Sequence, residues 1–451
     1  MSLQTAIVPT EWKTALITPI HKSGNTTEAN NFRPISVLPV ISKILEKAVQ
    51  QQLVEYLETN HHLSDSQFGY RKKRSTKVAT TLFIDNLRKA CDKGLVSGAL
   101  FIDLSKAFDT LGHANLLLKL ESTGVKGLAL NWFRDYLFGR KQIVKYNNEL
   151  SDPTTLLCGV PQGSILGPIL FLIFFDDFEK CLQNCKTIQF ADDTVIYISE
   201  KSIAEVQTKL NEDLAQIASY LQTNELIINL KKGKTEGMLV GTSKRLANDS
   251  LSELELHFRH EKINCTTEYK YLGTEIDQNL NLNKNFDQKM KKASVKLHLL
   301  KRLMSFLTQD AAITVYKSYI LPILKYNCLI QLNLTRTQKD KLATLVSRAE
   351  NIIQQDIPSI EQDFYRHSVK MVQKCLHGDV CSNLTNYFQM NNHLKVTRNR
   401  DLLIRIPKVK LETAKSGFFF MGAKLYNTLP REIRQSGDDF FKKLETFEFE
   451  F

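Results

Sequence analysis

The sequence lacks the features that mark secreted, zinc-binding and membrane-spanning proteins. Its eight cysteines form no Cys-x-x-Cys pair and no Cys/His cluster at zinc spacing, so we expect reduced and mostly buried thiols. The longest apolar run, residues 165–175, contains Gly167 and Pro168 and is shorter than the roughly 20 residues that cross a bilayer. Residues 1–6 show no basic segment followed by an apolar run, which argues against a signal peptide. We therefore expect an intracellular protein that does not span a membrane.

The sequence also has no internal repeat and no low-complexity segment, so we expect a globular chain. Its 451 residues are 43% hydrophobic, which is enough to fill the cores of two or three domains. The 60 Lys and Arg residues against 48 Asp and Glu residues give a net charge of +12. This excess suits a polyanionic partner such as nucleic acid, although a merely soluble basic surface would have the same composition.

Two adjacent acids, Asp192 and Asp193, stand between two apolar, β-favouring segments, 188–190 and 194–198. The pattern predicts a hairpin with both carboxylates at the turn. Two negative charges at an apolar site need a compensating cation, and hard divalent ions with oxygen ligands are the usual one. The other Asp-Asp pairs, at 176–177 and 438–439, are predicted to end elements rather than to join two strands. A solvated turn is the alternative for 192–193 taken alone.

A third acid, Asp103, follows a short apolar strand predicted at 98–102 and precedes the start of a helix or turn at 104–109. One carboxylate at a strand end and two on a hairpin resemble the catalytic triad of right-hand polymerase palms. In two-metal phosphoryl transfer, the ions activate the attacking oxygen and stabilise the leaving oxygen. Mg²⁺ suits such a site because it takes carboxylate ligands and keeps other positions for water and phosphates.

Three motifs together resemble the core of the reverse transcriptases of non-LTR (LINE-type, jockey-like) retrotransposons. They are Phe190 to Asp193, Asp103 to Phe108, and the turn Gly159-Val160-Pro161-Gln162-Gly163-Ser164, in the order and at the separations of that family. The resemblance implies that Asp103, Asp192 and Asp193 are catalytic and hold two Mg²⁺ ions, with Mn²⁺ as a substitute.

The resemblance also implies an α+β fold of the right-hand polymerase type, with fingers, a palm built on an antiparallel sheet, and a helical thumb. A mostly helical C-terminal region would follow. We place the fingers and palm in residues 1–280 and the thumb in residues 281–346. Residues 347–451 form the C-terminal region, to which the sequence assigns no role.

The resemblance gives several residues a role in nucleotide binding. Lys22 and Arg33, at the two ends of the fingers loop, would contact the triphosphate, unless they are only solvated charges. Phe108 would crowd the sugar 2′ position and favour deoxynucleotides, or else serve as plain core. Gln162 and Gly163 would approach the templating base pair, where glycine leaves room that a Cβ would fill; a turn with a helix cap is the alternative.

One further residue, Lys234, would bind the substrate nucleotide, and others would hold the strands of nucleic acid. Lys234 lies in a segment that resembles the family's Asn…Lys-Thr motif, with a longer gap that leaves its partner open. Leu272 and Gly273 resemble the primer grip, and a structural hairpin is the alternative. A basic run beside two aromatics would contact the template strand, or be a solvated face. It consists of Arg71, Lys72, Lys73 and Arg74.

The predicted function is therefore RNA-directed DNA synthesis, with an RNA template, a DNA primer or target, and dNTPs as partners. A catalytically inactive nucleic-acid-binding remnant of such an element is the alternative, and Phe108 disfavours an RNA-templated RNA polymerase. We find no endonuclease, zinc knuckle or ribonuclease H tract, so we expect a polymerase fragment without nuclease activity. We expect it to reside in the nucleus and/or cytoplasm as a ribonucleoprotein. The sequence indicates no oligomeric state.

Overall fold

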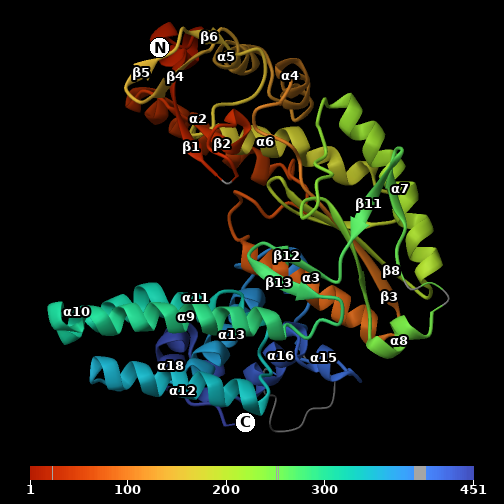
Figure 1. The fold of residues 1–451 in the computed structure, drawn as a ribbon, viewed down its shortest axis with the longest axis vertical. Coiled ribbons are helices and arrows are strands. Elements are labelled where there is room, and N and C mark those ends of the chain that lie inside the picture. Colours follow the sequence, from red (N-terminus) through yellow and green to blue (C-terminus); the bar gives the residue numbers. More distant parts are fainter. Residues whose placement is uncertain (23, 250, 252, 391–402, 451) are drawn as a thin grey trace.

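A six-stranded sheet forms the centre of the computed structural model, which describes all residues except 23, 250, 252, 391–402 and 451 (Figure 1). The central strand β3 is buried along its whole length and pairs antiparallel with β8 and β9. The parallel pair in this sheet joins β9 and β11. In sheet order the strands are β10 (Leu256–Phe258), β11 (Glu261–Cys265), β9 (Glu236–Val240), β3 (Val96–Ile102), β8 (Asp193–Glu200) and β7 (Lys186–Phe190).

The two faces of the central sheet are covered by different helices because side chains alternate along each strand. Ala99 and Phe101 of β3 pack into the hydrophobic cluster that contains α3 (Thr76–Asp92). Leu100 and Ile102 pack into a second cluster with α7 (Ile203–Thr223). The sequence predicts a helix from residue 76 to about 93 and, by apolar periodicity, another over residues 203–221, and both are confirmed. The sheet edge carrying the acids is therefore held rigidly from both sides.

A second sheet lies next to the N-terminus, at the end of the molecule opposite the C-terminal helices (Figure 1). Its strands β1 and β2 form an antiparallel hairpin, and β1 also pairs parallel with β4. The strands are β1 (Thr14–His21), β2 (Phe32–Val37), β4 (Lys141–Tyr146), β5 (Glu149–Leu150) and β6 (Thr154–Thr155). Four helices surround this sheet and join it to the central one: α2 (Val40–Thr59), α4 (His113–Ser122), α5 (Gly127–Leu137) and α6 (Gly167–Phe175). The short helix α1 (Ser2–Thr5) packs on α5.

The apolar positions predict a buried face for helix α2 that is confirmed in its second half, where Val49, Leu53 and Leu57 are buried, but not at its start. Ile41 and Ile44 are 60% and 66% exposed, whereas Ser42 and Glu46 are buried. The physical reason is that Glu46 accepts hydrogen bonds from the N–H groups of residues 165 and 166, just before α6. A carboxylate at a helix N-terminus satisfies donors that have no partner within the helix. The first half of α2 is thus turned by a polar contact rather than by its apolar stripe.

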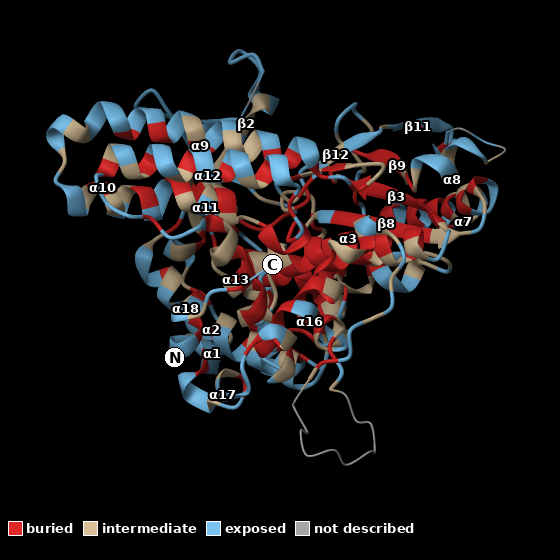
Figure 2. Ribbon diagram, turned by 90° about the horizontal axis from the view of Figure 1, so that it is seen from below, coloured by how far each residue is buried: buried red, intermediate tan, exposed pale blue. Residues whose placement is uncertain are grey.

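The remaining helices form one body with the central sheet, because a single hydrophobic cluster runs from α3 through α9 and α12 to α13 and α16. Residues 283–353 supply α9 (Asn283–Leu303), α10 (Gln309–Val315), a π-helical turn (Tyr316–Ile320), α11 (Leu321–Lys325) and α12 (Arg336–Ile353). The predicted division at residue 346 lies inside α12. The C-terminal helices are α13 (Ile360–Leu376), α14 (Ser382–Thr385), α15 (Glu412–Lys415), α16 (Phe418–Thr428), α17 (Arg431–Arg434) and α18 (Phe440–Thr446). Figure 2 shows α3 almost wholly buried beneath them.

The predicted α+β class is confirmed by this mixture of helices and largely antiparallel sheets. All eight cysteines are free thiols, as predicted, although Cys158 and Cys265 are exposed. Within the described part of the chain, the helices are either too short or too polar to cross a membrane.

Candidate active site

The three predicted catalytic acids lie at the same end of the neighbouring strands β3, β8 and β7 of the central sheet. The predicted hairpin is confirmed as β7 and β8, with Asp192 in the turn and Asp193 at the start of β8. In the antiparallel pairing of β3 with β8, Ile102 lies opposite Thr194. Asp103, the next residue along β3, therefore leaves the sheet beside Asp193. Strand pairing alone brings together acids that are about 90 residues apart in the sequence.

The acids repel one another in a partly desolvated position. Burial, followed by the charge of Asp103, raises the pKa of Asp192 above its ordinary value. Burial and the charges of Asp192 and Asp103 raise the pKa of Asp193 to about 6. Lys22 and Arg33 act in the opposite direction and lower the pKa of Asp192. The neighbouring cations therefore do not fully balance the negative charge of the acids, which is the condition under which carboxylates bind a cation.

Asp103 is held by two neighbours from a loop 130 residues downstream. Its Oδ2 accepts a hydrogen bond from Asn229 Nδ2 at 2.8 Å, and its Oδ1 lies 3.3 Å from Lys234 Nζ. The partner of Lys234, which the sequence left open, is thus Asp103, the first of the predicted catalytic acids. Asn229 was not predicted as a site residue, although it is the first polar residue of the Asn…Lys-Thr motif. Among the described residues, no three His, Cys, Asp or Glu side chains converge closely enough to hold a metal ion.

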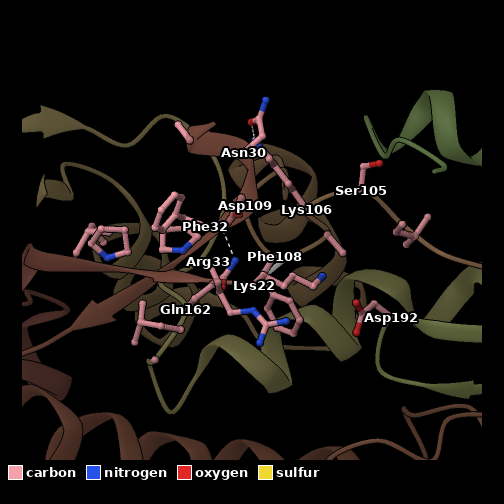
Figure 3. A pocket seen from close by; sticks show the side chains of 18 of the residues that line it. Lys22, Asn30, Phe32, Arg33, Ser105, Lys106, Phe108, Asp109, Gln162 and Asp192 are labelled. Carbon is pink, nitrogen blue, oxygen red and sulfur yellow. Dashed lines mark hydrogen bonds between the residues drawn. The ribbon is translucent and has the colours of Figure 1, made fainter. Parts of the chain in front are cut away.

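A large open cleft of about 1330 Å³ faces these acids (Figure 3). It lies between the β1–β2 hairpin and the edge of the central sheet. Most of the predicted catalytic and nucleotide-binding residues line it: Lys22, Arg33, Asp103, Phe108, Gln162, Gly163, Asp192 and Lys234. Two further lysines that the sequence did not single out, Lys106 and Lys231, also line it. The roles predicted for these side chains stay predictions, but the fold places them around one cavity.

Phe108 serves both the core and the cleft. Its ring stacks on Phe171 of α6 with centroids 4.9 Å apart, and the residue is half-buried while lining the cleft. Figure 3 shows the ring among Lys22, Arg33 and Asp192. The two interpretations of this residue in the sequence are therefore compatible, because a ring fixed from behind presents a rigid wall in front.

The turn that carries Gln162 and Gly163 is anchored to the β1–β2 hairpin. Ser36 N donates to the carbonyl of Gln162 at 2.7 Å, and Gly163 has φ 131°. A Cβ on Gly163 would lie 2.5 Å from Ser36 O. The space that a Cβ on Gly163 would take is thus occupied by the backbone of β2, and the approach of this turn to a base pair stays a prediction. The next residue supports the start of α6, since Gly167 N donates to Ser164 Oγ at 2.9 Å.

Leu272 and Gly273 lie on the other side of the acids. They form the turn between β12 (Glu268–Tyr271) and β13 (Thr274–Asp277), and both have positive φ, 43° and 76°. Asp193 and Asp103 share a smaller cavity of about 170 Å³ with this turn. Tyr326 donates to the carbonyl of Leu272 at 2.7 Å. A leucine held in the left-handed region stores strain, which is common at functional turns.

The basic run is only partly free to meet a ligand. Arg71 is paired with Glu58 at 2.8 Å and also donates to backbone carbonyls, and Arg74 is paired with Asp65. Lys72 and Lys73 are exposed, and Lys73 donates to the carbonyl of residue 378. The template contact predicted for this run therefore rests mainly on its two lysines.

A buried glutamine that sequence reasoning missed holds the turn between β7 and β8. Gln67 Oε1 accepts hydrogen bonds from Gly69 N at 2.8 Å and Ala191 N at 3.0 Å, and Nε2 reaches Gln189 at 3.3 Å. A Cβ on Gly69 would lie 2.5 Å from Ala191 N, so the two loops touch. The only signal in the sequence was that Gln67 and Gly69 directly precede the basic run.

Comparison with known proteins identifies this arrangement. A sequence profile described as "Reverse transcriptase (RNA-dependent DNA polymerase)" matches residues 20–276, more than half of the chain. The chain belongs to the reverse transcriptase family. This confirms the resemblance drawn from the three motifs. On the division predicted from the sequence, the central sheet would be the palm, the β1–β2 hairpin with its sheet the fingers, and α9 to α12 the thumb.

Several relatives of this chain come from mobile elements. The probable RNA-directed DNA polymerase from transposon X-element of Drosophila melanogaster is 24% identical over 426 residues, which are 89% of this chain and 46% of that protein. The RNA-directed DNA polymerase from mobile element jockey of Drosophila melanogaster is 27% identical over 335 residues, which are 72% of this chain and 36% of that protein. The chain thus spans less than half the length of these relatives. Among solved structures, the apo telomerase from Candida Tropicalis has a TM-score of 0.41 at 12% identity, covering 82% of this chain and 60% of that one.

Proposed function

We propose that this chain is an active RNA-directed DNA polymerase of a non-LTR retrotransposon. The observation that supports this most is that one cleft collects two of the three acids, the Phe108 ring, Gln162 and several cations. A dNTP needs these features together: acids for the reacting phosphate, cations for the triphosphate and a wall against the sugar. Its template would be RNA and its primer DNA, and we expect it to act inside the cell as a ribonucleoprotein.

We also infer that Asp103, Asp192 and Asp193 hold two Mg²⁺ ions, or Mn²⁺ in their place. The donor set fits such ions because all three side chains supply carboxylate oxygens, which are the ligands that Mg²⁺ prefers. Burial, followed by neighbouring negative charge, raises the pKa of Asp192 and Asp193. Bound there, the ions supply the activation of the primer 3′-OH and the stabilisation of the leaving pyrophosphate. In the chain itself, Lys234 and Asn229 engage the oxygens of Asp103 and keep its carboxylate oriented.

The other residues of the cleft bind and orient the nucleotide. Lys22 and Arg33 lie exposed at the loop end of the β1–β2 hairpin and would neutralise the triphosphate. Phe108 would exclude a 2′-hydroxyl, which selects deoxynucleotides. Leu272 and Gly273, beside Asp193, would position the primer end.

The test is primer extension on an annealed RNA template with dNTPs and Mg²⁺, comparing the wild type with Asp192→Asn. Template–primer binding is measured on the same preparations. Extension by the wild type alone would support both the activity and the acid site. Binding without extension by the wild type would instead support the inactive remnant.

A further inference from the structure

Gln162 is anchored at its backbone by the fingers and at its side chain by the palm. Its carbonyl accepts from Ser36 N, whereas its Nε2 donates to Asp109 Oδ1 at 2.8 Å. Asp109 directly follows Phe108, so a single turn supplies both the ring and the carboxylate. Figure 3 shows Asp109 and Gln162 joined by this hydrogen bond within the cleft. The Gln162 side chain is thus the one anchor of the turn that faces the cavity.

The carboxylate of Asp109 imposes one orientation on the Gln162 amide. Among the described residues, Gln162 is the hydrogen-bond partner of the Asp109 side chain. An ionised carboxylate only accepts hydrogen bonds, so the NH₂ group of Gln162 must face it. The amide oxygen and the second N–H are then presented elsewhere in the cleft. An amide without such a partner would exchange these two groups by a half-turn.

The path of the loop itself does not depend on this carboxylate. Val160 N donates to the carbonyl of Phe108 at 2.9 Å, and Gly159 N donates to that of Leu111 at 2.8 Å. A Cβ on Gly159 would lie 2.6 Å from the Asp109 carbonyl, so the two backbones are in close contact. Backbone bonds therefore fix where the loop runs. What the Asp109 side chain adds is the direction of one amide.

We propose that Asp109 is a positioning residue that fixes the Gln162 amide for contact with the incoming nucleotide. This inference rests on the proposed polymerase function. Asp109 acts through Gln162, and its removal should weaken nucleotide binding more than it slows the chemical step. Because the two residues form one unit, removing both should do no more than removing Gln162 alone.

The experiment is a double-mutant cycle of Asp109→Ala and Gln162→Ala, read as KM for dNTP and kcat in primer extension. We expect each single variant to raise KM about tenfold, the range for a lost hydrogen bond to a charged group, and the double variant to match Gln162→Ala. Asp109→Asn, which keeps the shape but accepts either amide orientation, should fall between wild type and Asp109→Ala. Cys158→Ala is the control, because its thiol contacts only the Asp109 backbone carbonyl at 3.4 Å, and it should stay within about twofold.

Multiplying effects in the double variant, or an unchanged KM in Asp109→Ala and Asp109→Asn, would overturn the proposal. The same cycle is measured as equilibrium dNTP binding to the template–primer complex with Ca²⁺ in place of Mg²⁺. A wild type that binds dNTP without extending primer would refute the polymerase proposal, and the cycle in binding would still decide the role of Asp109. A wild type that binds no dNTP would refute both.

Discussion

Replacing Gln67 by alanine tests how the palm holds its catalytic turn. Gln67 is completely buried, and its Oε1 is the acceptor for two backbone N–H groups, those of Gly69 and Ala191. Ala191 has φ 56°, a conformation that a non-glycine residue keeps only when its surroundings enforce it. The glutamine therefore bridges the loop before α3 and the residue just before Asp192.

The expected cost follows from the groups left without partners. Each stranded backbone N–H costs about 1–3 kcal/mol, so two cost about 2–6 kcal/mol. Water entering the space left by the shortened side chain would satisfy part of this, which places Gln67→Ala at about 2–4 kcal/mol. Extension should fall by at least about tenfold under conditions where the variant is folded, because the turn loses the bond next to Asp192.

Urea unfolding followed by circular dichroism, together with primer extension, measures both effects. Gln52→Ala is the matched control, because that glutamine lies exposed on α2 and bonds only the carbonyl of Ala48. It should change the free energy of unfolding by less than about 0.5 kcal/mol. If Gln67→Ala were as stable and as active as this control, the turn would be held by the strand pairing alone and the reasoning would be wrong.

Three more predictions follow from single contacts. Phe108→Val should raise the ratio of ribonucleotide to deoxynucleotide incorporation and destabilise the fold by about 2–3 kcal/mol through the lost stacking on Phe171, and an unchanged ratio would contradict the steric role. Asp193→Asn should stabilise the fold by about 1 kcal/mol near pH 8. The reason is that the pKa of Asp193 is raised to about 6, so its charged form lowers the stability of the native state at pH 8. The gain should vanish near pH 4, and thermal melting at a series of pH values checks this. Asp85→Ala should cost about 3–5 kcal/mol in chemical unfolding because it leaves the buried Arg88 without its acid, and a loss under about 1 kcal/mol would contradict this.

The elements that carry the acids could be predicted because their signals are local. Apolar residues end abruptly at Asp103 and resume on both sides of 192–193, so strand ends and a hairpin follow from the sequence alone. The helices α3 and α7 were predicted for the same reason. At the start of α2, the apolar residues predicted the wrong buried face, because Glu46 is buried there by a hydrogen bond from a residue 119 positions away in the sequence.

The contacts that orient the acids could not be predicted, because they join polar residues that are distant in the sequence. Asn229 and Asp103 are 126 residues apart, and Gln67 and Ala191 are 124 apart. A buried glutamine has no periodicity that distinguishes it from a surface one. Likewise, the sequence predicts that Arg71 contacts nucleic acid, whereas the structure shows that it forms an ion pair with Glu58. Only the fold shows which polar side chains are already used.

The C-terminal region is joined to the palm by the same kind of buried polar contact, which gives it at least a structural role. Asp85 of α3 accepts hydrogen bonds from Phe418 N and Phe419 N at the start of α16, and the neighbouring Arg88 donates to the carbonyl of Ile330, which precedes the C-terminal region. These groups have no access to water, so separating α16 from α3 would leave charges buried without partners or expose the apolar side of the palm helix. Because α3 also packs on β3, whose end precedes the predicted catalytic residue Asp103, the residues after the predicted thumb support the strand ends at which the proposed chemistry takes place.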